Sequence, residues 1–212
     1  MFSGKIEDYI LFEDKEIIVC RKPAGIAVQN ARIGAMDLES SLKNYLAMQD
    51  GGGRRIPYLA VIHRLDQPVE GILVFGKTPE AAKSLSAQIT AGKMEKIYLA
   101  VTYGKQAEAG KKEKVLEDYL KKDGKSNTSS VVNAHTPGAK KARLSYEVLG
   151  EAVDAISGKK KWLLRIHLDT GRHHQIRVQF ASRGLGLYGD TKYNSKFQKT
   201  KKKYTEIGLY ST

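Results

Sequence analysis

Asp66 lies where chemistry is often found in proteins, at the end of a strand. The apolar run 59–62 predicts a strand that ends shortly before it, and the run 72–75 predicts the next strand. A sheet holds the ends of its strands rigid while the connecting loop exposes its side chains. A carboxylate placed there can act as a nucleophile or as a general base. It can also cap the backbone of its own turn, which is the commoner role for an aspartate before a turn.

Two further residues have side chains that could assist a carboxylate. Tyr98 lies within the apolar run 97–102, which predicts a central strand, and Arg177 lies in the segment 173–183, which predicts a short helix closed by Gly184. Tyr98 could equally be a core tyrosine whose hydroxyl is satisfied elsewhere. Arg177 could equally form an ordinary ion pair on the helix surface. The spacing alone does not choose between these roles.

The charge of the chain suggests a polyanionic partner. Lys and Arg number 36 against 23 Asp and Glu, which gives a net charge of +13 and a pI near 9.6. An excess of this size in one domain is typical of proteins that bind nucleic acid. For any single lysine cluster, a solvated surface is the simpler explanation, but for the whole excess we favour RNA. The clusters lie at 111–112, 121–122, 140–141, 159–161 and 201–203.

Several classes of protein are disfavoured by what the sequence lacks. No apolar run approaches the roughly 20 residues of a membrane span, and the first residues have no signal-peptide core. The single cysteine, Cys20, cannot form an internal disulfide and is expected to be buried in a strand. No Cys or His pair has zinc-site spacing. The adjacent His173 and His174 should point in different directions on a helix, so we expect no shared metal.

The elements that must position these residues form a mixed fold in which strands predominate. Asp37 is the expected cap of a helix with Leu38, Leu42, Tyr45 and Leu46 on its apolar side. Thr78, before a proline, is expected to begin a second helix that ends at Gly92, with Ala82, Leu85 and Ile89 on its buried face. The residues 105–142, rich in Lys, Glu, Gly, Ser and Asn, predict exposed hairpins and loops that contact RNA. Further strands are expected at 17–21, 26–29, 142–149 and 161–168.

Four motifs in order along the chain resemble those of the RluA-type pseudouridine synthases. Residues 63–66 read His-Arg-Leu-Asp, as in the active-site motif of that family, although Val69 and Glu70 stand where its Thr-Ser pair is usual. The resemblance runs from about Phe12 to the last residue. The other matches are Lys-Pro-Ala-Gly at 22–25, Lys-Ile-Tyr at 96–98, and Leu-Asp-Thr-Gly-Arg-His-His-Gln-Ile-Arg at 168–177 with Gly189, Asp190 and Tyr193 downstream.

The resemblance implies an α+β fold with a mixed, largely antiparallel central sheet, flanked by helices and loops, and a central active-site cleft. It implies one catalytic domain over 1–212. Only about a dozen residues precede the first strand, so we expect the small N-terminal RNA-binding domain of many relatives to be absent. Family members usually continue into a final strand beyond the position of Leu209, and we expect that strand to be missing.

The activity implied is isomerisation of a specific uridine in RNA to pseudouridine, without a cofactor. By resemblance, Asp66 is the essential carboxylate and the Arg177 guanidinium keeps it ionised and aimed. Tyr98 lies against the target uracil, and its hydroxyl can accept a proton late in the reaction. Leu187 covers the other face of the pocket, although a leucine at that position could also be plain core.

RNA contacts are expected from residues near these motifs. Arg64 could stack between bases after the uridine is extruded, or instead contact a phosphate or pair with Glu70. His63 is expected to orient the loop through a hydrogen bond, and Lys22 and Arg172 to bind phosphates. The partner is then ribosomal or transfer RNA, and we expect a cytoplasmic monomer with no bound metal.

Two other functions remain open from the sequence. The chain could be a catalytically inactive RNA-binding protein of the same fold, because Val69 and Glu70 depart from the motif. Retention of Asp66, Tyr98 and Arg177 argues against that alternative. It could also be an unrelated aspartate enzyme such as a phosphotransferase. The common enzymes of that type need a second aspartate two residues on for magnesium, and residue 68 is proline.

Overall fold

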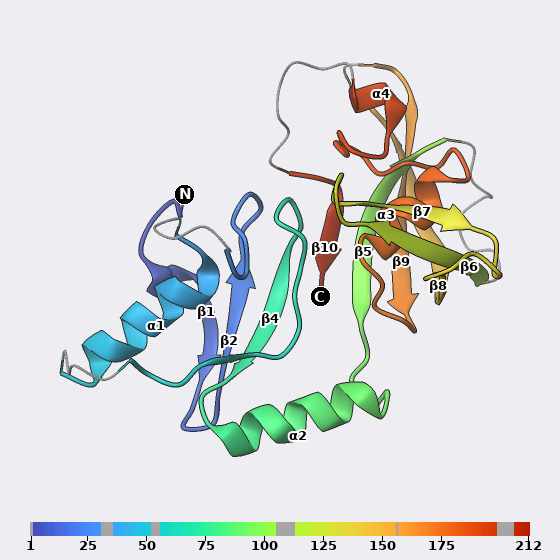
Figure 1. Ribbon diagram of the computed structural model, residues 1–212. Helices are drawn as coiled ribbons and strands as arrows, with labels where there is room; N and C mark the ends of the chain where they lie inside the picture. The colour runs from blue at the N-terminus through green and yellow to red at the C-terminus, as the bar shows by residue number, and fades with distance from the viewer. Residues whose placement is uncertain (1, 31–35, 52–55, 105–112, 156, 199–205) are drawn as a thin grey trace. The chain divides into compact units, whose positions relative to one another are not determined.

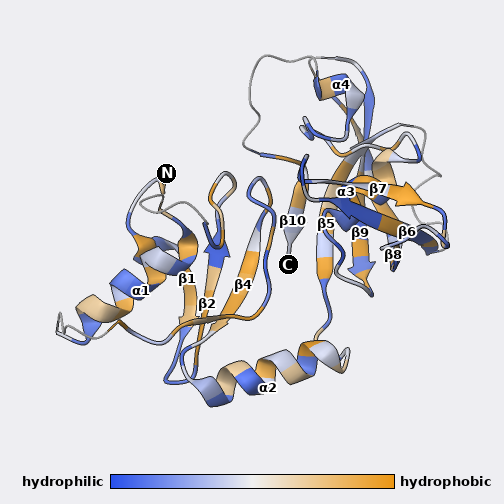
Figure 2. Cartoon of the chain, in the orientation of Figure 1, coloured by the Kyte–Doolittle hydropathy of each residue, from blue (hydrophilic) through white to orange (hydrophobic). Residues whose placement is uncertain are grey.

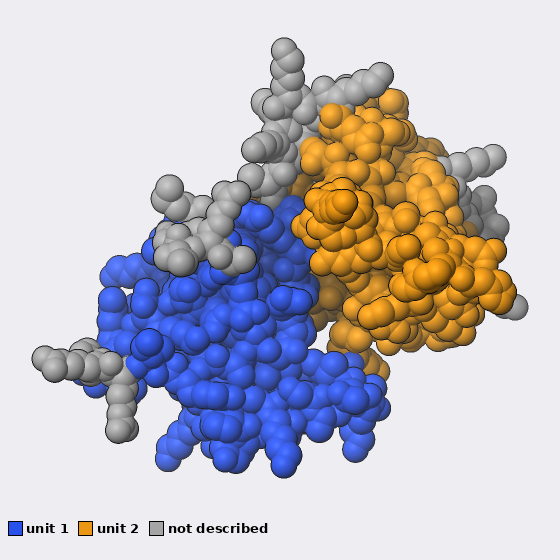
Figure 3. All heavy atoms as spheres, in the orientation of Figure 1, with its two compact units in different colours: residues 1–94 blue, residues 95–212 orange. Residues whose placement is uncertain are grey.

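A computed structural model describes residues 2–30, 36–51, 56–104, 113–155, 157–198 and 206–212. The chain divides into two compact units, residues 1–94 and residues 95–212 (Figure 3). Each unit contains an antiparallel sheet and helices (Figure 1), which confirms the α+β class with largely antiparallel strand pairing.

The first unit is built on strands β1, β2 and β4, which pair in that order, with the short β3 pairing with β4. Strand β4 is predominantly apolar (Figure 2), and Leu73 and Phe75 are completely buried. Cys20, on β2, is also completely buried as expected, and burial raises the pKa of its thiol to about 12. The elements are η1 (Ile6–Tyr9), β1 (Ile10–Glu13), β2 (Ile17–Lys22), α1 (Leu38–Gln49), β3 (Ala60–Val61), β4 (Glu70–Gly76) and α2 (Pro79–Thr90).

Both helices of the first unit begin at the residues that the sequence predicts. The Asp37 carboxylate accepts the backbone N–H of Ser40, and the Thr78 hydroxyl accepts that of Ala81, as N-caps do. In α1 the residues Leu38, Leu42 and Leu46 are buried as expected. The expected face of α2 is less covered than predicted, because Ala82, Leu85 and Ile89 are only partly buried.

The prediction of a strand at 26–29 is wrong, because this segment forms no strand. Ile26 and Val28 are buried, but the backbone carbonyls of this segment accept bonds from outside any sheet. The carbonyls of Ala27 and Val28 accept the N–H groups of Leu38 and Glu39, at the start of α1. The apolar alternation therefore reflects burial of an irregular segment that closes over the helix N-terminus, and its backbone groups are satisfied without a strand partner.

The second unit is an antiparallel sheet in the order β10-β5-β9-β8-β6-β7. Strands β5, β8 and β9 agree with the sequence prediction. The elements are β5 (Ile97–Tyr103), β6 (Lys114–Asp123), β7 (Thr128–Val132), β8 (Lys140–Val153), β9 (Lys160–Leu168), α3 (Gln175–Ala181), α4 (Ser195–Gln198) and β10 (Leu209–Ser211).

Helix α3 packs on the face formed by β6 and β8. Its Phe180 ring meets the Tyr146 ring edge-to-face with centroids 5.0 Å apart, and Val178 packs with Leu120 and Ala142. The Gln179 side chain, also completely buried, donates to the Asp118 carboxylate at 2.7 Å. This packing fixes the helix, and with it the position of the Arg177 side chain.

The region 105–142 contains more regular strand structure than the sequence predicts. A hairpin is present as expected, but β6 and β7 form its arms, and Leu116 and Leu120 of β6 are buried. Residues 105–112 lie outside the described part of the chain. The chain's last residues form the short strand β10, which pairs with β5 and was not expected from the sequence.

Candidate active site

Asp66 lies in a tight turn between β3 and β4. Its backbone carbonyl accepts the N–H of Val69 at 2.9 Å. The flanking Leu65 and Val69 are both buried, and Asp66 itself is partly exposed. Val69 stands where the family motif has a hydroxyl residue, and here apolar packing holds the turn at that position.

The hydrogen bond expected of His63 is present. Its Nε2 accepts the backbone N–H of Val74 on β4 at 3.4 Å, which ties the segment before Asp66 to the strand that follows it. Arg64, between His63 and Asp66, is exposed, so its guanidinium is accessible to solvent from this loop. Both residues are thus placed by the same strand ends that place the carboxylate.

Lys22 occupies a different place from the predicted phosphate-binding one. Its side chain is completely buried, and its Nζ donates to the backbone carbonyls of Pro23, Ile26 and Gln67 at 2.9, 2.8 and 3.1 Å. Gln67 follows Asp66, and it also exchanges bonds with Gly25 through its carbonyl and its side-chain amide. The prediction that Lys22 binds an RNA phosphate is wrong for this structure, because the ammonium joins the 23–26 loop to the Asp66 turn.

The environment of Lys22 lowers the pKa of its ammonium group. Burial lowers the pKa of the Lys22 ammonium from 10.5 to about 8, and the carboxylates of Asp66 and Glu70 offset part of this effect by attraction. A buried cation is thus retained next to the candidate catalytic carboxylate, where it stabilises negative charge and fixes the loop.

Replacing this lysine tests its structural role. Lys22→Met should lower the free energy of unfolding by about 1–3 kcal/mol, because three carbonyls lose their donor. The unfolded chain holds the Lys22 proton up to a higher pH than the folded chain does. The stability of the wild type relative to Lys22→Met should therefore rise as pH increases from about 8 to 10.5. Urea unfolding of both proteins across this pH range measures both effects, and equal pH profiles would contradict the assignment.

Tyr98 lies in the second unit on β5, with Ile166 of β9 on one side and Ser211 of β10 on the other. Its side chain is 8% exposed, and it shares the strand face of the buried Ala100. The position mid-strand holds the ring rigidly. Leu187, the predicted second wall of the pocket, is completely buried and bridges to Thr102 of β5. This burial favours the alternative of a core leucine.

Arg177 forms a buried, two-point ion pair with Asp190. Its Nε donates to Oδ2 at 2.9 Å and its Nη2 to Oδ1 at 2.8 Å, and the two side chains are 5% and 1% exposed. The Tyr193 ring lies 5.1 Å from the guanidinium carbon. Asp190 also accepts the backbone N–H groups of Lys192 and Tyr193. The alternative considered from the sequence, an ion pair of Arg177 on the helix surface, is therefore not what the structure has, because the Arg177–Asp190 pair is buried.

Asp190 belongs to the C-terminal motif, but the resemblance assigned it no role. The presence of an acidic residue thirteen positions after Arg177, in the same motif, could have indicated this ion pair. Asp66 belongs to the first unit and Arg177 to the second, so the predicted Asp66–Arg177 ion pair stays a prediction. Arg172, the other predicted phosphate ligand, is exposed at the turn before α3, and its Nε donates to the Lys141 carbonyl at 2.8 Å.

The adjacent histidines do not diverge as the sequence predicts. Helix α3 begins at Gln175, and His174 before it has a left-handed backbone with φ of 54°. The imidazoles therefore stack, with centroids 3.7 Å apart. His173 Nδ1 bonds to the Ser129 hydroxyl and His174 Nδ1 to the Tyr193 hydroxyl, at 2.8 and 2.6 Å. These bonds tie the hairpin of β6 and β7 to the segment that holds Asp190.

Within the described ranges, no group of three or more His, Cys, Asp and Glu side chains is placed to hold a metal ion. In the same part of the chain, no helix is both long and apolar enough to cross a membrane. The first unit offers a carboxylate held in a rigid turn, and the second offers a tyrosine on a central strand and a buried arginine. A carboxylate and a tyrosine can move a proton, whereas an arginine can only orient a neighbouring group.

Several known proteins that this chain resembles are described as pseudouridine synthases. A family model described as RNA pseudouridylate synthase matches residues 16–182. An uncharacterized RNA pseudouridine synthase of Zymomonas mobilis is 33% identical over 188 residues, which cover 88% of this chain and 78% of that protein. The ribosomal large subunit pseudouridine synthase D of Pseudomonas aeruginosa is 32% identical over 194 residues, which cover 91% of this chain and 55% of that protein.

The chain therefore spans only about half the length of several curated relatives that it matches, including a synthase D of Nitrosomonas europaea with 49% of its length covered. Among solved structures, human RNA pseudouridylate synthase domain containing 1 matches all of this chain and 79% of its own, with a TM-score of 0.75 and 18% identity. That likeness concerns the fold.

Proposed function

Because the chain belongs to the RNA pseudouridylate synthase family, we propose that it isomerises a uridine of RNA to pseudouridine with Asp66 as the essential carboxylate. The observation that carries the proposal is the construction of the Asp66 turn. Buried Leu65 and Val69 hold it on both sides, and Lys22 bonds it to the neighbouring loop. A carboxylate on a rigid turn is oriented in advance for reaction, and its loop remains accessible to a substrate.

The reaction breaks the bond between ribose and uracil, turns the uracil and rejoins it to the ribose through carbon-5. The hydrogen at carbon-5 then leaves as a proton, and the uracil N1 released from the ribose gains one, so the overall reaction is an isomerisation that needs no oxidant and no energy input. Asp66 supplies the negative charge next to the ribose and base. Tyr98 is the proposed wall against the uracil, and Arg177 is the proposed partner of the Asp66 carboxylate, with both units forming one catalytic domain.

Ribosomal RNA is the proposed substrate, since relatives that are identical to this chain at about a third of the aligned positions are named for the large ribosomal subunit. Transfer RNA is the second candidate. The proposed site of action is the cytoplasm and the proposed form is a monomer. A basic protein with pI near 9.6 is suited to a folded RNA, whose target nucleotide must be extruded before reaction.

The proposal is tested by release of tritium from RNA that carries uridine labelled at carbon-5. The purified protein, with a chelator present, should release tritium from ribosomal RNA transcripts and produce pseudouridine in equal amount. An inactive RNA-binding protein of the same fold would bind the transcript and release none. A requirement for magnesium in the reaction itself would indicate a phosphotransferase-like enzyme and would contradict the proposal.

Affinity for RNA should depend steeply on salt, because cations that contact phosphates release bound counterions. Between about 50 and 200 mM salt, binding should weaken at least about tenfold, given the roughly 10³–10⁵ loss expected for 6–10 contacts. Lys140→Glu should reduce the slope. Lys140, at the start of β8, is exposed and forms no ion pair within the residues that the structure describes.

The matched control for that change is Lys83→Glu, an exposed lysine on α2 of the first unit. It should leave the slope close to that of the wild type. Fluorescence anisotropy with a labelled transcript measures both variants. An equal loss of slope in both would mean that overall charge, and not the 105–142 region, governs binding. Lys201 to Lys203, for which a smaller effect is expected, lie outside the described residues.

A further inference from the structure

Lys96 belongs to the Lys-Ile-Tyr motif, and the proposed reaction gives it no role. Its backbone carbonyl accepts the N–H of Leu168 at 2.9 Å, so it extends the ladder between β5 and β9 by one residue. Side chains two residues apart on a strand lie on the same face, about 6–7 Å from each other. Lys96 therefore shares the strand face of Tyr98, the proposed wall against the uracil.

The ammonium of Lys96 lies beside the turn that leads to α3. A Cβ placed on Gly171 would lie 3.8 Å from the Lys96 Nζ. The side chain is half-buried, and within the described ranges its ammonium has no hydrogen bond or ion pair. Burial lowers the pKa of Lys96, attraction to Asp169 raises it, and repulsion by Arg172 lowers it again. Lys96 and Arg172 are thus close enough to repel each other.

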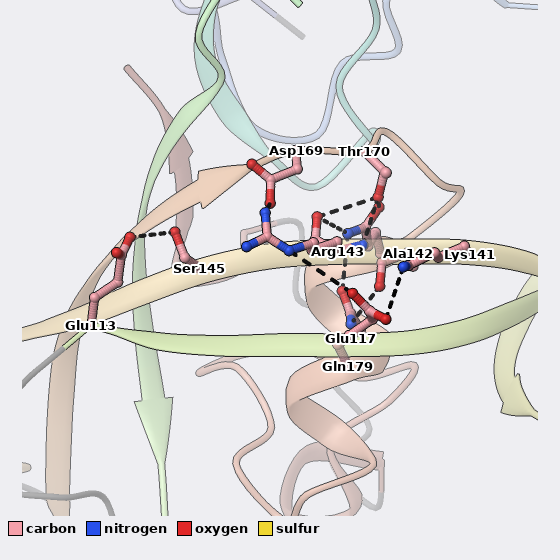
Figure 4. A network of polar contacts seen from close by, with 10 residues as sticks. Glu113, Glu117, Lys141, Ala142, Arg143, Ser145, Asp169, Thr170 and Gln179 are labelled. Carbon is pink, nitrogen blue, oxygen red and sulfur yellow. Dashed lines mark hydrogen bonds and ion pairs between the residues drawn. The ribbon is translucent and has the colours of Figure 1, made fainter.

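The acids of this neighbourhood are already engaged by other cations. Arg143 lies between Asp169 and Glu117, and Lys141 pairs with Glu117 at 2.9 Å (Figure 4). Arg172 uses its Nε to donate to the Lys141 carbonyl, which fixes the plane of the guanidinium. Its two terminal nitrogens have no bonded partner in the part of the chain that the structure describes. Two cations without a paired anion therefore flank the Gly171 turn.

We propose that Lys96 and Arg172 together bind one phosphate of the RNA backbone, next to the uridine that lies against Tyr98. The inference rests on the proposed function for the identity of the nucleotide. A half-buried lysine and an exposed arginine that repel each other are both stabilised by an anion between them. A phosphodiester has its charge one sugar away from the base, which matches a cation two strand residues from Tyr98. Gly171 leaves the backbone of the turn open beside the ammonium.

Binding of a fluorescein-labelled oligouridylate tests the proposal without turnover. Lys96→Met and Arg172→Met should each weaken binding about tenfold at low salt, the loss expected for one charge-assisted hydrogen bond. Each should reduce the slope of log affinity against log salt by about 0.7, as for one phosphate of a single strand. The double variant should lose less than the sum of the two, because both residues hold the same phosphate. Lys93→Met, an exposed lysine three residues away, should bind like the wild type.

Titration of Lys96 by NMR of its carbon-ε separates phosphate binding from a structural role. Saturating oligouridylate should raise the pKa of Lys96 above its value in the unbound protein, whereas inorganic phosphate at the same concentration should raise it less. Additive losses in the double variant, a Lys93→Met variant that loses as much as Lys96→Met, or an unchanged Lys96 pKa would each overturn the proposal. These readouts do not need pseudouridine formation, so failure of the proposed function would appear separately, as RNA binding without isomerisation.

Discussion

Asp66→Asn should abolish pseudouridine formation while the protein stays folded and binds RNA almost as the wild type does. The amide has nearly the shape of the carboxylate, but it is neither negatively charged nor nucleophilic. We expect a loss of at least about a hundredfold, which corresponds to about 2.7 kcal/mol of the activation barrier. Quantifying pseudouridine by mass spectrometry in a transcript treated with each protein measures the effect.

The matched control is Asp50→Asn, an exposed aspartate at the end of α1 that belongs to none of the motifs. It should leave activity unchanged. Circular dichroism and RNA affinity of both variants separate chemistry from folding. Residual activity of Asp66→Asn above about a hundredth of the wild type would mean that another group carries the reaction.

The second large effect concerns the buried Arg177–Asp190 pair. Arg177→Met should lower the free energy of unfolding by about 3–5 kcal/mol, because it leaves the Asp190 carboxylate buried without its counter-ion. Combining it with Asp190→Leu should recover part of that loss, because an apolar pair can replace a buried ion pair. Urea unfolding of the single and double variants measures these differences.

An exposed ion pair in the same unit provides the comparison. Arg165 and Glu147 face each other on β9 and β8 at 2.8 Å, with side chains 48% and 42% exposed. Arg165→Met should cost only about 0–1 kcal/mol, since solvent screens such a pair. If Arg177→Met costs no more than Arg165→Met, the Arg177–Asp190 pair does not hold α3 to the 189–193 segment.

The parts of the fold that were predictable from the sequence depend on local signals. The helix starts at Asp37 and Thr78 were predictable because an N-cap bonds to the backbone three residues later. The end of α2 at Gly92 was predictable because glycine readily adopts a left-handed backbone, and Gly92 has one, with φ of 67°. Each of these features is decided within a few residues of chain.

The errors arise where the deciding partner is distant along the chain. The segment 26–29 is buried and apolar like a strand, but its backbone carbonyls accept hydrogen bonds from the N–H groups at the start of α1. Lys22 looked like a surface cation, and three carbonyls, one of them 45 residues away, hold it in the interior. The stack of His173 and His174 follows from a left-handed residue before α3 that nothing in the local sequence required.

In the candidate site, too, the sequence indicates residue types and their order, whereas their contacts depend on partners that are distant along the chain. The motifs single out Asp66, Tyr98 and Arg177 as the predicted site residues, because residue type and order along the chain are what a motif contains. They did not reveal that Asp190 holds Arg177, or that the acids near Lys96 are taken by Arg143 and Lys141. Such pairings depend on strand register and helix packing, and these were available only from the structure.

The central claim is that this protein makes pseudouridine in cellular RNA and that Asp66 is required for it. The most direct measurement is a map of pseudouridines in total RNA from the source organism, compared between the wild type and a strain whose chromosomal copy carries Asp66→Asn. We predict that at least one pseudouridine of ribosomal or transfer RNA disappears in the variant strain, while the variant protein is present at normal abundance. A pseudouridine map that is identical in the two strains would contradict it.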